Sequence, residues 1–244
     1  MFESSKSTRM LKKILKLSKR GKHEAVVKLA DELYELYSDS EDQQKRIHAK
    51  IGLIAKTPSL LMLEKHHDAV LNSDRIISVF TDDAFIDDIE NQYRVGYIRE
   101  ANWNKVKALF SLEEYDKAGV LIDSIVDEYI TYTDDITEYL TANMLLMKAD
   151  IVKVNSQDIN DRLAVFNRIV NRYHRSNDFD VLDQVIAALT EMMIICIQLD
   201  DYKNALVIRQ IAQQLVGADP VKVQRIVTGT EQFKTYLDEV NAEQ

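Results

Sequence analysis

The stretch Leu112-Glu113-Glu114-Tyr115-Asp116-Lys117-Ala118 returns as Leu199-Asp200-Asp201-Tyr202-Lys203-Asn204-Ala205. Each copy carries two acidic residues before a tyrosine and places an alanine three residues after it. Related segments end at Ala25, Ala69 and Arg162, so that positions 25, 69, 118, 162 and 205 form a column with spacings of 43 to 49 residues. A repeat of this length, with each copy a helix–turn–helix, is typical of an α-solenoid.

Helical periodicity runs along nearly the whole chain. Apolar residues recur at steps of three or four, as in Val26, Leu29 and Leu33, and no sustained alternation typical of strands is present. Only six Gly and two Pro occur in 244 residues, which favours long helices with short connections. Eleven residues after each column position a second column follows, made of Leu36, Phe80, Tyr129, Tyr173 and Val216.

These patterns predict an all-α protein: an α-solenoid of about five antiparallel helix pairs and a final capping helix, about eleven helices in one domain over residues 1–244. The approximate repeats cover residues 6–37, 43–80, 88–130, 136–173 and 179–217, and the capping helix covers residues 220–242. One helix pair cannot bury its own apolar stripe, whereas a stack of pairs builds a continuous core.

Local signals predict where helices begin and end. We expect Pro58 to end the helix that begins near Gln43, because its ring clashes with the preceding turn. Asp219-Pro220 is expected to start the capping helix. Polar clusters are expected to cap the helices that follow them: 38–42, 81–83, 133–135 and 176–178.

On the two quoted segments the chain resembles the tetratricopeptide-repeat family. In that family an aromatic residue ends the turn, and a small residue three positions later allows the two helices of a pair to cross closely. The segment from Arg162 to Tyr173 looks like the second helix of bacterial members with lengthened repeats. The likeness covers roughly residues 6–217, but the period is about ten residues longer than the usual 34, and Arg162 stands where alanine is expected. Membership implies binding through a concave groove and no reaction.

Charge is distributed unevenly along the chain. The net charge is −9, yet residues 1–22 contain eight Lys or Arg and one acid, Glu3. The remaining residues therefore carry a net charge of −16, which argues against a nucleic-acid-binding body. The basic stretch 6–22, with Lys12, Lys13, Lys16 and Lys19, leaves three readings open: a solvated face of the first helix, a surface for an anionic membrane or nucleic acid, or a contact with the acidic body of a second copy.

No pattern in the sequence predicts catalysis or a cofactor. The five histidines lack the i, i+4 spacing of a zinc helix, and neither a phosphate-binding loop nor a nucleophile elbow is present. The acidic residues between Asp82 and Glu90 lack the glycine of a calcium loop. Cys196 lies among apolar residues and is expected to be a buried, inert thiol. We expect no enzyme, no metal and no cofactor.

The expected function is therefore that of a scaffold, adaptor or chaperone-like module for a protein or peptide segment. Because the body is acidic, we expect a basic or amphipathic partner. Candidate groove contacts are the tryptophan, phenylalanine, methionine, isoleucine and lysine residues of the third and fourth repeats: Trp103, Lys107, Phe110, Met144, Met147, Lys148 and Ile151. The alternative is a regulatory protein that binds nucleic acid or an anionic membrane through residues 6–22.

The expected location is the cytoplasm. No apolar run reaches the roughly 18 residues that a membrane-spanning helix needs. The basic N-terminus is followed by more Lys and Arg, which is unlike a secretory signal, and Cys196 is the sole cysteine.

Overall fold

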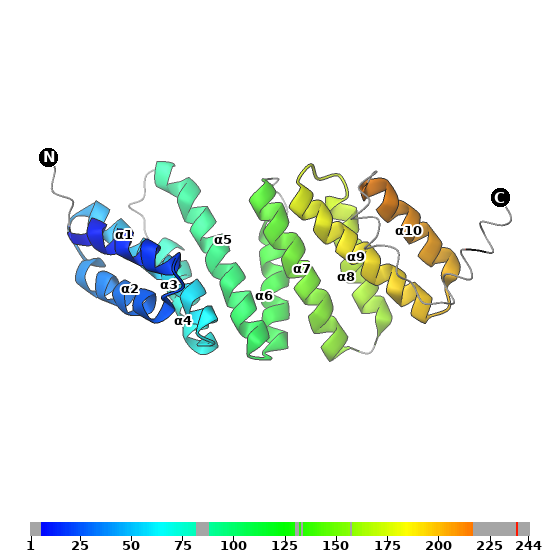
Figure 1. Cartoon of the computed structure of the whole chain (residues 1–244), viewed down its shortest axis with the longest axis horizontal. Coiled ribbons are helices and arrows are strands. Elements are labelled where there is room, and N and C mark those ends of the chain that lie inside the picture. Colours follow the sequence, from blue (N-terminus) through cyan, green and yellow to red (C-terminus); the bar gives the residue numbers. More distant parts are fainter. Residues whose placement is uncertain are drawn as a thin grey trace. The chain divides into compact units, whose positions relative to one another are not determined.

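In a computed structural model the described residues, 6–81, 88–129, 132, 134–156, 158–216 and 238, form ten α-helices and no strand (Figure 1). The all-α class is thus confirmed. The helices are α1 (Lys6–Ser18), α2 (His23–Tyr37), α3 (Gln43–Met62), α4 (His66–Thr81), α5 (Asp88–Ser111), α6 (Tyr115–Glu128), α7 (Asp135–Asn155), α8 (Ile159–Tyr173), α9 (Phe179–Gln198) and α10 (Tyr202–Val216). The expected capping helix 220–242 lies outside the described residues, apart from Asp238.

Aspartates at the polar clusters cap three of the helices. A carboxylate oxygen of Asp42 accepts a hydrogen bond from the Lys45 amide at 3.3 Å, that of Asp134 from the Thr137 amide at 3.0 Å, and that of Asp178 from the Val181 amide at 2.9 Å. Each bond satisfies an amide that has no partner within its own helix. The capping role predicted for these clusters is confirmed, and the cluster at 81–83 is described only at Thr81.

One turn geometry closes four of the ten helices. Gly21, Glu64, Glu113 and Asp200 have φ between 57° and 66°, in the left-handed region. The amide that follows each of them donates to a carbonyl five residues back, as from Lys65 to Leu60 and from Glu114 to Leu109. This is the Schellman cap, and it reverses the chain into α2, α4, α6 and α10.

These turns correct the alignment of the first repeat. Ala69, Ala118 and Ala205 are fully buried at the fourth position of each second helix, and their amides bond to the carbonyl of the residue that precedes the helix. In α2 that position belongs to the fully buried Val26, because the amide of Val26 bonds to the carbonyl of Lys22, while Ala25 is exposed. The column expected at Ala25 is therefore wrong by one residue. The same shift replaces Leu36, which is exposed, by the half-buried Tyr37 in the second column.

The expectation that Pro58 ends its helix is also wrong. Pro58 lies inside α3, which continues to Met62. The proline cannot donate a hydrogen bond to the turn before it. The carbonyl that lacks this donor is that of Ile54, four residues earlier. Asn72 of α4 bonds to two other acceptors of this turn, the Leu53 carbonyl and Thr57 Oγ1, each at 2.8 Å. The helix continues past the proline within its packing on α2, α4 and α5.

The chain divides into two compact units, residues 1–121 and 122–244. In the first unit α1 packs on α2 and α3, α3 on α2, α4 and α5, and α4 on α5. Gly52 of α3 permits a close approach to α2, because an added Cβ would lie 3.1 Å from Leu33 Cδ2. In the second unit α7 packs on α8 and α9, and α9 packs on α8 and α10.

An ion pair between the second helix of one pair and the first helix of the next recurs in the same positions. In the first unit Lys56 Nζ lies 2.6 Å from Asp31 Oδ1, and Lys105 Nζ lies 2.6 Å from Asp74 Oδ1. In the second unit Lys148 Nζ lies 2.8 Å from Asp123 Oδ2. Asp31, Asp74 and Asp123 each stand five residues after Val26, Ala69 and Ala118, the buried column of the repeat.

A different ion pair joins α8 to α9. Arg162 of α8 lies 3.3 Å from Glu191 of α9. Arg162 stands in the column of Ala118 and Ala205, five residues before the position of the aspartates, so this pair is not equivalent to the aspartate–lysine pairs. Arg162 stands where the other second helices carry a small residue, and its guanidinium also lies over the ring of Phe166. The departure noted in the sequence therefore has a structural role: a long side chain at this position reaches the following helix.

Candidate functional site

Trp103 lies on one face of α5 between two charged residues, Glu100 and Lys107. Lys107 Nζ lies 5.2 Å from the centre of the Trp103 ring, within cation–π range. Residues 100, 103 and 107 follow the three- and four-residue steps of a single helix face. Glu100 and Lys107 make no hydrogen bond or ion pair with a described residue, although both are partly buried.

Burial shifts the protonation of both charged groups toward the neutral form. It raises the pKa of Glu100, against a weaker opposing effect of Lys107, and lowers the pKa of Lys107, against Glu100. Such shifts mark charges that have lost water without gaining a close partner. A polar group brought by a ligand would supply that partner, so this face is the best candidate among the residues expected from the sequence.

Phe110 is directed into a different contact. Its ring meets that of Tyr115 edge-on, with centroids 5.5 Å apart, at the turn between α5 and α6. It therefore helps to hold the helix pair closed, and it remains only half-buried.

The four candidate residues on α7 belong to the second unit and play mostly structural roles. Met144 and Ile151 are core residues, 1% and 3% exposed, so neither side chain is accessible to a partner. Lys148 pairs with Asp123, which Arg168 of α8 also approaches at 3.7 Å. Of the four, Met147 alone is a partly exposed side chain without an assigned contact.

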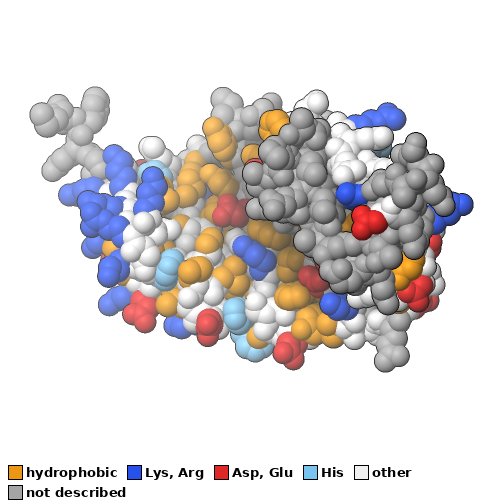
Figure 2. Space-filling model, turned by 45° about the vertical axis from the view of Figure 1, so that its right-hand side comes forward, with side chains coloured by type: hydrophobic (Ala, Val, Ile, Leu, Met, Phe, Trp, Pro, Cys, Tyr) orange, Lys and Arg blue, Asp and Glu red, His pale blue; other side chains and the backbone are white. Residues whose placement is uncertain are grey.

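The second candidate surface is the basic face of α1. All eight cations of residues 6–22 are exposed, and none forms an ion pair with a described residue: Lys6, Arg9, Lys12, Lys13, Lys16, Lys19, Arg20 and Lys22. Figure 2 shows Lys and Arg side chains gathered at the left edge of the view, where α1 lies. We refer to these eight residues as the basic face.

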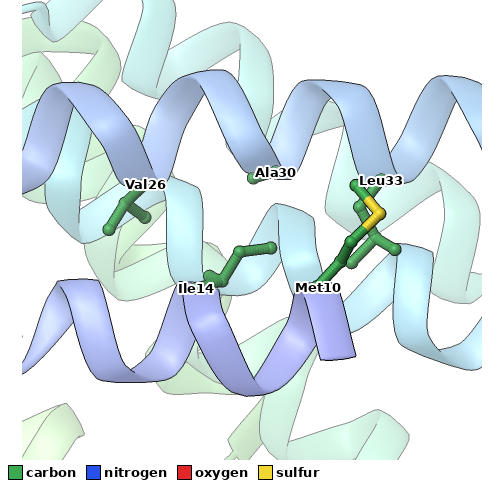
Figure 3. Close-up of a cluster of buried hydrophobic side chains, with 5 residues drawn as sticks. All are labelled: Met10, Ile14, Val26, Ala30 and Leu33. Carbon is green, nitrogen blue, oxygen red and sulfur yellow. The ribbon is translucent and has the colours of Figure 1, made fainter. Parts of the chain in front are cut away.

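The apolar side of α1 is already occupied. Met10 and Ile14 point toward α2, where they meet Val26, Ala30 and Leu33 (Figure 3). Ile14, Val26, Ala30 and Leu33 are fully buried, and Met10 is 7% exposed. The helix therefore uses its hydrophobic stripe for the core and offers the basic face to solvent.

This arrangement of charges destabilises α1 in isolation. Neighbours at three- and four-residue steps, such as Arg9 and Lys13 or Lys12 and Lys16, carry like charges, and each such pair costs about 0.2–0.5 kcal/mol. The first turn of α1 contains no acidic residue to offset the helix dipole. Five ion pairs among the described residues engage cations of α3, α5, α7 and α8, whereas the eight cations of the basic face take part in none.

Two grooves in the first unit were not foreseen from the sequence. The first groove, of about 310 Å³, lies along α2, α3 and α4, and the second, of about 270 Å³, along α4, α5 and α6. Seven positions line both: Val27 and Val70, Asp31 and Asp74, Lys56 and Lys105, Leu60 and Leu109, Lys65 and Glu114, Asp68 and Lys117, and Asn72 and Leu121. A larger hollow of about 620 Å³ adjoins the first groove and is lined mainly by α2.

The sequence does contain a signal for these grooves, because each of the seven shared positions of the first groove has its counterpart in the second groove 43 or 49 residues later. Finding it required the correct alignment of the first repeat, because an error of one residue moves Asp31 out of phase with Asp74. The charges at two of the seven positions are inverted, since Lys65 and Asp68 correspond to Glu114 and Lys117. The grooves therefore share one shape and differ in polarity.

The described part of the chain brings together no three His, Cys, Asp or Glu side chains in a geometry that could hold a metal ion. Cys196 is 8% exposed, and burial, with Asp201 nearby, raises the pKa of its thiol. A raised pKa disfavours the reactive thiolate. None of the described helices has the length and apolarity that crossing a bilayer requires.

No model of a protein family matches this chain, and no curated protein is significantly similar to it.

Proposed function

We propose that this protein is a non-catalytic interaction scaffold, a tetratricopeptide-like α-solenoid of antiparallel helix pairs that binds a segment of a partner protein. The observation that carries the proposal is the face of α5, where Trp103 lies between two partly buried charges that have no hydrogen bond or ion pair with a described residue. Buried aromatic residues with adjacent charges are the usual anchors of protein interfaces.

The solenoid reading is supported by three features that recur with the repeat. They are the left-handed turn after the first helix, the small or β-branched residue buried at the fourth position of the second helix, and the aspartate–lysine pair to the next repeat. A structure in which each pair repeats the contacts of the last leaves long, similar surfaces, which suit extended partners.

The expected partner of the α5 face is a basic or amphipathic segment. A cation from the partner would pair with Glu100, and an apolar side chain would cover Trp103. The positive charge of Lys107 already offsets part of the negative charge of Glu100. Lys107 would also pair with an acidic group of the partner at the edge of the contact. Opposite charges on such a partner would offset the desolvation cost that Glu100 and Lys107 already bear in the free protein, which favours the bound state.

The test is selection of peptides from a displayed library against the full chain, followed by fluorescence anisotropy with the selected peptides. We expect Trp103→Ala to weaken binding at least tenfold. Phe179→Ala serves as the matched control, because Phe179 is an exposed aromatic on α9 of the second unit, and it should leave the affinity unchanged. Equal affinities for all three proteins would exclude the α5 face.

A second candidate function rests on the basic face of α1. A regulatory protein could bind nucleic acid or an anionic membrane through these exposed cations. The combined reversal of Lys12, Lys13, Lys16 and Lys19 to glutamate tests it, with a DNA duplex and anionic vesicles as probes. Retained peptide binding with loss of both probes would place the two activities on separate surfaces, and loss of all binding would favour the regulatory reading.

A further inference from the structure

We infer that the basic face of α1 is a docking surface for an acidic helical segment of a partner protein. This surface is distinct from the α5 face and does not depend on the function proposed for it. The inference rests on the placement of the eight cations, on the burial of the opposite side of α1, and on the charge of the rest of the chain.

The cations form a line along the helix. Lys6, Arg9, Lys13, Lys16 and Arg20 follow one another at steps of three or four residues, so they share one side of α1 and its C-terminal turn. At 1.5 Å per residue the line is roughly 21 Å long, with a charge about every 5 Å. A helix with Asp or Glu at three- and four-residue steps has the same spacing, and the two can therefore pair in register.

Repulsion within this line of cations lowers the stability of α1. Acidic residues outnumber basic ones in the sequence by 40 to 31, so partners for the cations of α1 are plentiful in composition. Elsewhere in the chain lysines do pair with acidic residues, as Lys56 and Lys105 pair with aspartates of the preceding helix. Local features that oppose folding are expected at functional sites, and an acidic partner would turn this repulsion into attraction.

The same observations disfavour a membrane and a nucleic acid as the occupant. Membrane insertion of an amphipathic helix needs a free apolar side, and that of α1 is buried on α2, with Ile14 fully covered. A long polyanion extends beyond the basic face, while the rest of the chain carries a net charge of −16 and exposes Glu24, Glu32 and Glu35 on the adjacent α2. A short acidic helix needs to cover no more than the basic face.

The test uses fluorescence anisotropy with the full chain and three labelled probes. They are an 18-residue alanine-based helical peptide with glutamates at three- and four-residue steps, a DNA duplex, and vesicles of phosphatidylcholine with phosphatidylserine. We expect the acidic peptide to bind, with an affinity that falls steeply as salt rises. Lys13→Glu with Lys16→Glu should weaken it at least tenfold.

The matched control is Lys153→Glu with Lys203→Glu, which changes the net charge equally at exposed lysines of the second unit and should leave binding unchanged. Circular dichroism confirms that each variant is folded. The inference is overturned if the α1 variant binds the acidic peptide as the parent protein does, if the control variant loses as much affinity, or if duplex or vesicles bind more tightly than the peptide. Loss of the Trp103 interaction does not affect this result, so failure of either proposal is seen separately.

Discussion

Asn72 connects α4 to the turn of α3 that precedes Pro58. It is 4% exposed and donates to the Leu53 carbonyl and to Thr57 Oγ1. The rule that proline ends a helix is sound locally, but α3 continues to Met62 within its packing on α2, α4 and α5. Asn72 stands fourteen residues after Pro58 and reaches this turn only after α3 and α4 have packed, so no local pattern could reveal the contact.

We predict that Asn72→Ala lowers the free energy of unfolding by about 1–3 kcal/mol, the usual cost of leaving a buried polar group unsatisfied. The loss should be the same in a Pro58→Ala background, because the amide restored at position 58 donates to the Ile54 carbonyl and not to the Leu53 carbonyl. Urea denaturation of the four proteins of this double-mutant cycle measures the coupling. Effects that are not additive would show that Asn72 compensates for the proline.

His48 makes the first unit sensitive to acid. Its Nδ1 lies 3.1 Å from Oγ of the buried Ser7, and burial lowers the pKa of the imidazole from 6.5, against a weaker opposing effect of Asp42. The folded state thus binds a proton less readily than the unfolded state. Stability from this group is fully present above pH 6.5 and is lost as the pH falls below that value toward the lowered pKa.

We therefore predict that the melting temperature falls on acidification below pH 6.5, and that His48→Gln reduces the slope of this fall. Glutamine keeps a polar group near Ser7 without titrating in this range. His67→Gln, at an exposed histidine of α4, serves as the control and should follow the parent protein. Identical pH profiles for all three proteins would contradict the role assigned to His48.

At the scale of one helix, α1 combines a well-packed apolar side with a basic face that repels itself. The sequence predicted both sides of this helix, because the periodicity of Met10 and Ile14 is clear and the cations lie between them. The structure adds that the two sides are separated, with every cation exposed and Ile14 fully buried. This separation is usual for an amphipathic surface helix, and α1 differs from the helices with ion pairs in that its exposed cations form none with a described residue.

Relief of the repulsion should stabilise the protein. We predict that Lys13→Glu raises the free energy of unfolding by about 0.5–1 kcal/mol at low salt. The substitution turns the repulsion between residue 13 and its neighbours Arg9 and Lys16 into attraction. Raising the salt concentration to about 1 M should remove most of the gain, because the Debye length then falls to about 3 Å. A variant less stable than the parent at low salt would show that the cations are compensated within the chain.

At the scale of the whole molecule, the all-helical class followed from composition and periodicity, whereas the surfaces proposed for binding followed only in part. Periodicity identifies which residues lie on the apolar side of a helix. It does not tell whether residues such as Met144 and Ile151 lie in the core or line a groove. Trp103 and Lys107 were predicted as contacts, yet the third member of that face, Glu100, became evident only from its burial. The repeated grooves depend on an alignment that the geometry of the Gly21 turn alone determines.

The far end of the second unit gives a further prediction. Val207 and Ile211, four residues apart on α10, are 46% and 39% exposed, and no described helix follows them. We predict that deletion of residues 219–244 causes concentration-dependent self-association, measured by analytical ultracentrifugation, because a repeat array needs a cover for its last apolar side.

The control for this deletion is the same truncated chain with Val207→Lys and Ile211→Lys, which should remain monomeric. A truncated protein that is itself monomeric, and that binds peptides more tightly than the full chain, would instead indicate that the deleted segment competes for the binding surface.

The turns and packing described above also bear on how the chain folds during its synthesis. Every extensively packed pair among the described helices joins neighbours in sequence or next neighbours, as α1 with α2 and with α3. Short loops close quickly, and folds rich in such contacts cross their barriers within microseconds to milliseconds. The first helix pairs can therefore assemble while the ribosome is still translating the later ones, so exposed apolar stripes are covered in order, from the N-terminal end onward.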